Sequence, residues 1–138
     1  MEFRFSPEQQ QKLCECGVAT VYLFGSHAEE TTHPLSDVDF AVLMKDARTV
    51  STGVSTHALY QKLYDVLSSI IPKETKDIDI IFLDRAPLEL QNNVVHFGRV
   101  LFDDNIRRRF AFEERTKLAY ADFEPIRRIV DAAVLQRV

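Results

Sequence analysis

Residues 24 to 43 read FGSHAEETTHPLSDVDFAVL, and this stretch places two aspartates at the start of an apolar strand. Aspartate is among the poorest strand formers, yet Asp37 and Asp39 open the segment DVDFAVLM, which is otherwise typical of a buried strand. Because side chains along a strand alternate between its two faces, both carboxylates are expected on one face and the apolar side chains on the other. Gly25 and Ser26 break the preceding apolar strand, VATVYLF.

The segment DIDIIFL, residues 77 to 83, repeats this pattern with Asp77 and Asp79. If the two aspartate-bearing strands are neighbours in one sheet, three or four carboxylates converge on one patch. Aspartate also begins many loops and turns, so each pair is equally compatible with a solvated strand end. The residues alone leave both readings open.

A cation site is the functional reading of these carboxylates. Like charges at this spacing repel each other, and burying an unpaired carboxylate costs several kcal/mol. Mg²⁺ prefers hard oxygen ligands and usually takes one or two protein carboxylates, with water and substrate phosphate completing its shell. Gly25 permits close approach of the backbone, and the Ser26 hydroxyl at a helix start suits a triphosphate. Two ions held in this way would suit a phosphoryl-type displacement.

The remaining pattern predicts an α/β (α+β) fold with a small mixed sheet layered with helices. Ser6 and Pro7 begin a helix that ends near Gly17. A helix is expected from about 54 to 70, another after Pro87, and a short extended piece at 99–102. From residue 105 the pattern is helical, and Pro125 is expected to divide it into two helices. The chain is interpreted as one domain, 1–138, with 103–138 as a helical extension; the relative direction of the two aspartate-bearing strands stays open.

Composition excludes several functional classes. The 138 residues are 46% apolar and 28% charged, with a net charge of −4, which argues against broad nucleic-acid binding. No apolar run is long enough to cross a bilayer, and the N-terminus lacks the apolar core of a signal peptide, so a cytoplasmic location is expected. Cys14 and Cys16 are interpreted as ordinary thiols. A cluster of arginines is expected either to dock an acidic partner surface or to form a solvated helix face with Glu113 and Glu114: Arg107, Arg108, Arg109, Arg127 and Arg128.

The motifs together resemble a known family. Gly25-Ser26, ten intervening residues and Asp37-Val38-Asp39 match the signature of the DNA polymerase β-like nucleotidyltransferases. The whole chain, and in particular DIDIIFLDRAPLEL and LAYADFEPIRR, is similar to the minimal nucleotidyltransferases (MNT), which are antitoxin partners of HEPN-domain toxins.

This resemblance implies roles for individual residues. Gly25 and Ser26 would bind the phosphates of ATP, and Asp37 and Asp39 would hold Mg²⁺, with two ions in the site. Asp79 matches the third acid, which binds one metal and helps to deprotonate the attacking hydroxyl; Asp77 lies outside the pattern. The implied reaction transfers AMP from ATP to a tyrosine hydroxyl of a HEPN ribonuclease toxin, with no part for membranes or direct nucleic-acid binding.

One departure from the family keeps alternatives open. Glu29 and Glu30 stand where the family has arginine and glycine, and acids beside a triphosphate weaken its binding unless they point outward. An antitoxin that neutralises its toxin by binding alone is therefore a second hypothesis, and a stand-alone nucleotidyltransferase for a small molecule is a third. His27 and His33 lie in the same loop and either touch nucleotide or metal or serve as loop polar groups.

Overall fold

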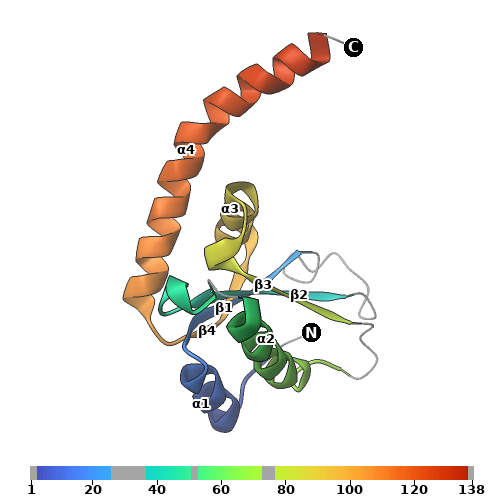
Figure 1. Cartoon of the computed structure of the whole chain (residues 1–138), viewed down its shortest axis with the longest axis vertical. Coiled ribbons are helices and arrows are strands. Elements are labelled where there is room, and N and C mark those ends of the chain that lie inside the picture. The colour runs from blue at the N-terminus through green and yellow to red at the C-terminus, as the bar shows by residue number, and fades with distance from the viewer. Residues whose placement is uncertain (1–2, 26–36, 51–52, 73–76, 137–138) are drawn as a thin grey trace.

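The fold is a four-stranded mixed sheet with helices on both faces, which confirms the predicted α/β class (Figure 1). The computed structural model describes residues 3–25, 37–50, 53–72 and 77–136. The strand order is β3-β2-β1-β4; β1 is antiparallel to both β2 and β4, and β2 is parallel to β3. The strands are β1 (Val18–Phe24), β2 (Val38–Met44), β3 (Ile78–Phe82) and β4 (Arg99–Asp103).

The helices begin and end near the positions that the sequence predicts. In α1 the Ser6 Oγ accepts a hydrogen bond from the Gln9 N–H at 3.2 Å, and the Gln9 side chain accepts one from the Ser6 N–H at 2.7 Å. This capping box and Pro7 begin the helix as expected. Gly17, with φ of +81°, follows the end of α1. The helices are α1 (Pro7–Glu15), α2 (Gly53–Ser68), α3 (Leu88–Phe97) and α4 (Ile106–Gln136), and the short 3-10 turns are η2 (Ala47–Val50) and η3 (Leu83–Arg85).

The parallel pairing of β2 and β3 settles a point that the sequence left open. Parallel neighbours need a long crossover, and α2 supplies it. The register places Val38 opposite Ile78, Asp39 opposite Asp79 and Phe40 opposite Ile80. The two aspartate-bearing strands therefore start at the same edge of the sheet.

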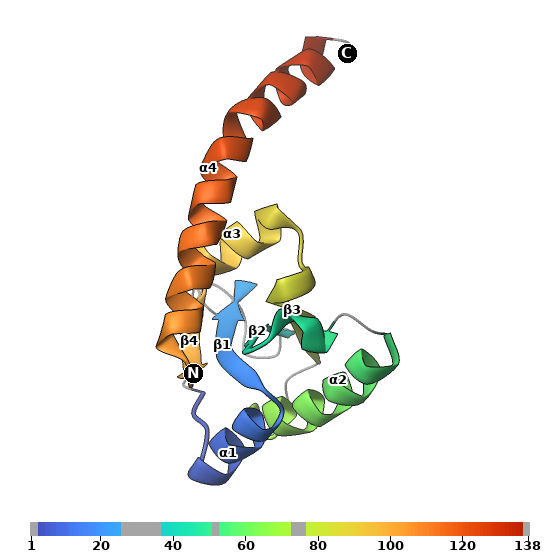
Figure 2. The ribbon, with the colours of Figure 1, turned by 60° about the vertical axis from the view of Figure 1, so that its left-hand side comes forward.

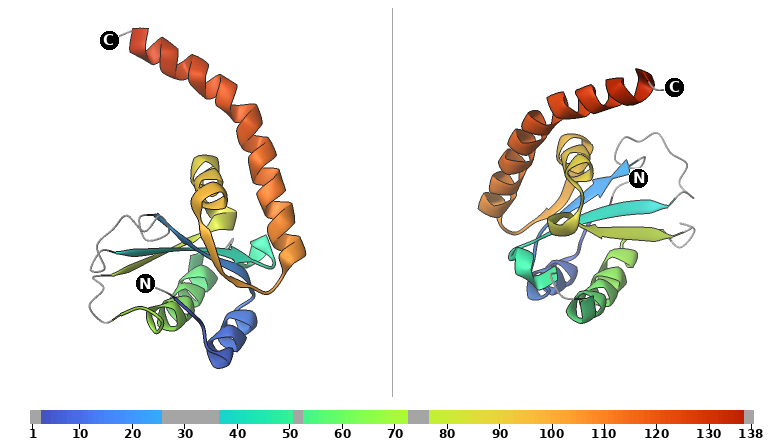
Figure 3. Two further views of the ribbon diagram at one scale, coloured as in Figure 1. Left: turned by 180° about the vertical axis from the view of Figure 1, so that it is seen from behind. Right: turned by 45° about the horizontal axis from the view of Figure 1, so that its top comes forward.

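Each face of the sheet packs against its own pair of helices, as Figures 2 and 3 show. The even-numbered residues of β2 and β3, such as Phe40 and Ile80, lie in the core beneath α1 and α2 with Leu13 and Leu63. The odd-numbered side chains take the other face, where Ala41, Leu43 and Ile81 meet residues of α3 and α4, including Val94 and Phe112. Strand alternation assigns Asp39 and Asp79 to this second face.

The C-terminal segment is one helix, not two. α4 runs for 31 residues with Pro125 inside it, so the predicted break at this proline is wrong. Proline removes one backbone N–H and bends a helix, but a helix can continue through it. α4 changes direction along its length and extends beyond the sheet and α3 (Figures 1 and 3). Within the described ranges, no helix is both long and apolar enough to span a membrane.

Candidate active site

Asp39 and Asp79 lie side by side on neighbouring strands. They are paired residues in the parallel register of β2 and β3, and neighbouring strands lie only about 4.8 Å apart. Asp39 is partly buried, whereas Asp79 is exposed on the edge strand. The predicted meeting of carboxylates from two strands is therefore realised by this pair, on the sheet face that carries α3 and α4.

Gly25 lies against the carboxylate of Asp39. It directly follows β1, and its φ of +75° is in the left-handed region that L side chains rarely adopt. A Cβ at this position would lie 2.6 Å from Oδ2 of Asp39. The position therefore excludes a side chain for two reasons, backbone conformation and space. The sequence identifies this glycine, but not its contact with Asp39.

Asp37 and Ser26 complete the predicted set, with different outcomes. Asp37 immediately precedes β2, two residues before Asp39, and is exposed. Ser26 lies outside the described residues, and the same holds for the remaining loop residues that the sequence singles out: His27, Glu29, Glu30 and His33.

Asp77 does not join the pair. Its carboxylate accepts hydrogen bonds from the Tyr64 hydroxyl of α2 at 3.1 Å and from the Ile78 N–H at 2.8 Å. This hydrogen bond raises the pKa of the Tyr64 hydroxyl. The prediction that Asp77 shares a face with Asp79 is wrong, because the Asp77 carboxylate contacts Tyr64 of α2, which packs on the opposite face of the sheet. Asp77 is a strand-start residue, in agreement with its place outside the family pattern.

The carboxylates of Asp39 and Asp79 fit a hard divalent cation as part of its ligand shell. Among the described residues, no group of three or more acidic, histidine or cysteine side chains forms a complete metal cluster. Mg²⁺ needs only one or two protein carboxylates when water and phosphate supply its other ligands. The Asp39–Asp79 pair meets that requirement. A groove of about 860 Å³ between α1 and α2, lined in part by Lys12 and Lys62, lies on the opposite face and has no part in this site.

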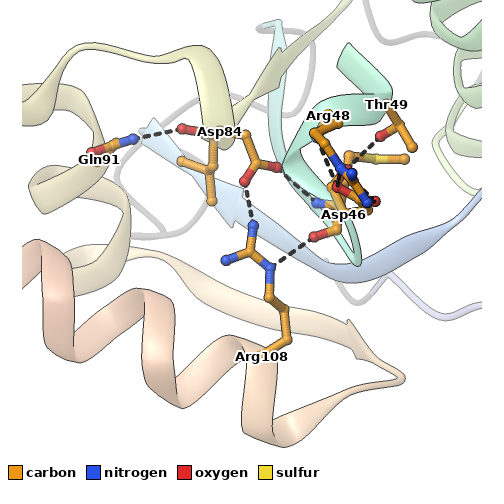
Figure 4. A network of polar contacts seen from close by, with 8 residues as sticks. Asp46, Arg48, Thr49, Asp84, Gln91 and Arg108 are labelled. Atoms are coloured by element: carbon orange, nitrogen blue, oxygen red, sulfur yellow. Dashed lines mark hydrogen bonds and ion pairs between the residues drawn. The ribbon is translucent and has the colours of Figure 1, made fainter. Parts of the chain in front are cut away.

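An interior ion pair connects α4 to the sheet near the end of β2 (Figure 4). Arg108 donates to a carboxylate oxygen of Asp84, and its Nε donates to the Met44 carbonyl at 3.0 Å. The other Asp84 oxygen accepts the Met44 N–H at 3.1 Å. The Asp84 side chain is only 2% exposed. Sequence reasoning missed this pairing, since the residues are far apart in the chain and each resembles a surface charge.

Three other arginines of the cluster, Arg109, Arg127 and Arg128, also have partners within the chain. Arg109 binds Asp103 at 2.7 Å and Glu113 at 3.2 Å, and Glu113 accepts the Tyr22 hydroxyl. Burial and this carboxylate raise the pKa of Tyr22. Further ion pairs join Arg127 to Glu89 and Arg128 to Glu124. Arg108 therefore serves internal packing, a role that the sequence analysis missed. The Arg109–Glu113 ion pair is one that the sequence analysis expects, although both side chains are only 18% exposed.

Comparison with known proteins identifies the family. Residues 9–107 match the family described as "Polymerase beta, Nucleotidyltransferase". The chain belongs to this nucleotidyltransferase family. The predicted resemblance is thereby confirmed, and the matched range of the nucleotidyltransferase includes β1, β2 and β3 with Gly25, Asp37, Asp39 and Asp79.

Relatives of the nucleotidyltransferase come from toxin–antitoxin systems. It is 35% identical over 82 residues to the protein adenylyltransferase MntA of Shewanella oneidensis; the match covers 59% of this chain and 52%, about half, of that relative. A crystal structure of a toxin–antitoxin with AMP-PNP has a TM-score of 0.64 at 26% identity, covering 91% of this chain and 98% of that one. A mutant MntA toxin–antitoxin complex has a TM-score of 0.65 at 27% identity, with coverages of 91% and 93%.

Proposed function

We propose that this nucleotidyltransferase is the antitoxin of a HEPN–MNT pair. It transfers AMP from ATP to a tyrosine hydroxyl of the HEPN ribonuclease toxin and releases pyrophosphate, and this modification inactivates the toxin. The observation that carries the proposal is the in-register pair Asp39 and Asp79, with the backbone of Gly25 against Asp39. Support comes from the similarity to a protein adenylyltransferase and to a toxin–antitoxin structure with AMP-PNP.

Each residue of the site has a proposed role. Asp37 and Asp39 hold Mg²⁺, and Asp79 holds one ion and accepts the proton of the attacking hydroxyl. Gly25 and Ser26 bind the triphosphate through backbone and hydroxyl groups. Bound Mg²⁺ supplies Lewis-acid stabilisation of the charge on the reacting phosphate. The exposed position of Asp79 at the sheet edge leaves that carboxylate accessible to a protein acceptor.

A second candidate is an antitoxin that acts by binding alone. Glu29 and Glu30, in place of the family's arginine and glycine, favour it, because acids near a triphosphate oppose its binding. In that case toxin neutralisation would need neither ATP nor Mg²⁺.

Intact-mass measurement of the toxin separates the two candidates. The protein is incubated with Mg²⁺, ATP and its proposed HEPN toxin partner, and ribonuclease activity is followed in parallel. We expect the toxin to gain the mass of one or more AMP groups and to lose ribonuclease activity only when ATP is present. A neutralised toxin of unchanged mass would instead establish the binding-only mode, and EDTA serves as the metal-removal control.

A further inference from the structure

The distal part of α4 presents an apolar stripe to solvent. Phe123, Ile126, Val130 and Val134 are 38%, 59%, 55% and 56% exposed. Exposed apolar side chains are ordinary when scattered, but a contiguous row on a helix marks a surface that packs against something else. We call these four residues, with Ala133, the α4 stripe.

The α4 stripe continues the row by which the first half of α4 packs on the body. Phe112 and Thr116 are buried, and the alternating steps of four and three residues lead on to the exposed members of the row. The row consists of Phe112, Thr116, Ala119, Phe123, Ile126, Val130 and Ala133, and Val134 lies next to its last member. Such spacing is the seam of helix-on-helix packing. The partner that fits the exposed part is therefore another helix.

α3 covers only the first part of this row. Glu89, in the first turn of α3, reaches Arg127 at 2.7 Å, and α4 continues past that point. Figure 2 shows the end of α4 extending beyond α3. α3 and α4 both pack on the sheet face to which Asp39 and Asp79 belong. A protein bound to the α4 stripe thus approaches from the side of the two aspartates.

We propose that the α4 stripe is the docking surface for a helical face of the HEPN toxin, whose acceptor tyrosine then reaches the aspartate pair; this inference rests on the proposed function. Surface area favours the toxin over a second copy of the chain. Four half-exposed side chains offer on the order of 400 Å², below the about 800 Å² per partner of a standard interface. A toxin that is also the substrate makes a second contact, at the aspartates. A second copy of this chain that docks on the α4 stripe alone makes no such contact.

The test compares two double variants of the full-length protein. Ile126→Glu with Val130→Glu places two charges in the α4 stripe. Leu118→Glu with Leu135→Glu places the same charges on the outer side of α4, at side chains that are 62% and 75% exposed. Glutamate is a good helix former, and all four positions are exposed, so both variants retain the helix. Equal far-UV circular dichroism verifies this.

Affinity for the HEPN toxin is measured by calorimetry without ATP. We expect the stripe variant to bind about tenfold or more weakly than the wild type, and the outer-face variant to bind as the wild type does. Equal affinity of the two variants would overturn the inference. A wild-type homodimer in sedimentation that the stripe variant abolishes would also overturn it, in favour of a second copy.

The two proposals fail separately. If the toxin binds through the α4 stripe but never gains AMP, the docking inference stands and the enzymatic proposal fails. Asp39→Asn serves as the converse control: we expect it to abolish AMP transfer, and adding Ile126→Glu and Val130→Glu to this variant to weaken toxin binding by the same factor as in the wild type.

Discussion

Gly25 and Asp39 define the site at the residue scale, since the aspartate occupies the space that a side chain on residue 25 would need. Gly17 provides a natural comparison. Its φ of +81° is equally left-handed, but a Cβ there would meet only the end of Met44, at 3.6 Å. The two glycines therefore share a backbone requirement and differ in the close contact with a carboxylate.

Gly25→Ala is expected to abolish AMP transfer, because the new Cβ displaces the Asp39 carboxylate. Both Gly25→Ala and Gly17→Ala should lower the free energy of unfolding by roughly 1–2 kcal/mol, the cost of an L residue in the left-handed region. Urea unfolding and toxin mass measure the two effects. If Gly17→Ala loses activity to the same extent, the loss is due to backbone strain and not to Asp39.

Asp84 is expected to be a major contributor to stability. Asp84→Ala removes the carboxylate that accepts from the Arg108 guanidinium and from the Met44 N–H, and breaking a buried pair costs about 3–5 kcal/mol. The control is Asp46→Ala, which removes a carboxylate that pairs with Arg48, a side chain that is 89% exposed. An exposed pair contributes less than about 1 kcal/mol. Similar losses in urea unfolding for both variants would contradict this account of Asp84.

At the scale of elements, the local sequence pattern predicted where helices and strands lie better than it predicted how the strands pair. The capping residues at Ser6 and the apolar run at 18–24 predict α1 and β1 near their observed bounds. The direction of β3 was not predictable, because a crossover helix permits either direction and the choice depends on packing across the sheet. The prediction at Pro125 was wrong because it considered this residue alone. The free-energy cost of the proline is offset by helix on both sides, so α4 continues through it.

Replacement of Pro125 tests whether this proline weakens α4 locally. Pro125→Ala restores a backbone hydrogen bond and removes a residue that costs about 3 kcal/mol in a helix interior. We expect slower amide exchange in the helical turns around residue 125, with unchanged exchange in β1 and β2, measured by hydrogen–deuterium exchange and mass spectrometry. Unchanged exchange around residue 125 would show that the helix accommodates the proline without local opening.

At the scale of the whole molecule, both faces of the sheet pack against helices, and the aspartate pair belongs to only one of them. One face is closed by α1 and α2, and the other holds the aspartate pair beneath the side from which α3 and α4 rise (Figure 3). Alternation along the strands predicts Asp39 and Asp79 as neighbours once the strands pair. It does not predict the turn of Asp77 toward Tyr64. The family motif identifies site residues, but tertiary contacts decide which of them meet.

The most direct test is the intact mass of the HEPN toxin after incubation with ATP, Mg²⁺ and a variant of this protein. Two variants are compared, Asp79→Asn and Asp77→Asn, each of which replaces a carboxylate by an amide. The two residues lie two positions apart at the start of β3, but only Asp79 pairs with Asp39. We expect Asp77→Asn to add AMP to the toxin as the wild type does, and Asp79→Asn to leave the toxin unmodified. AMP transfer by Asp79→Asn at the wild-type rate, or its loss in Asp77→Asn alone, would contradict the proposed site.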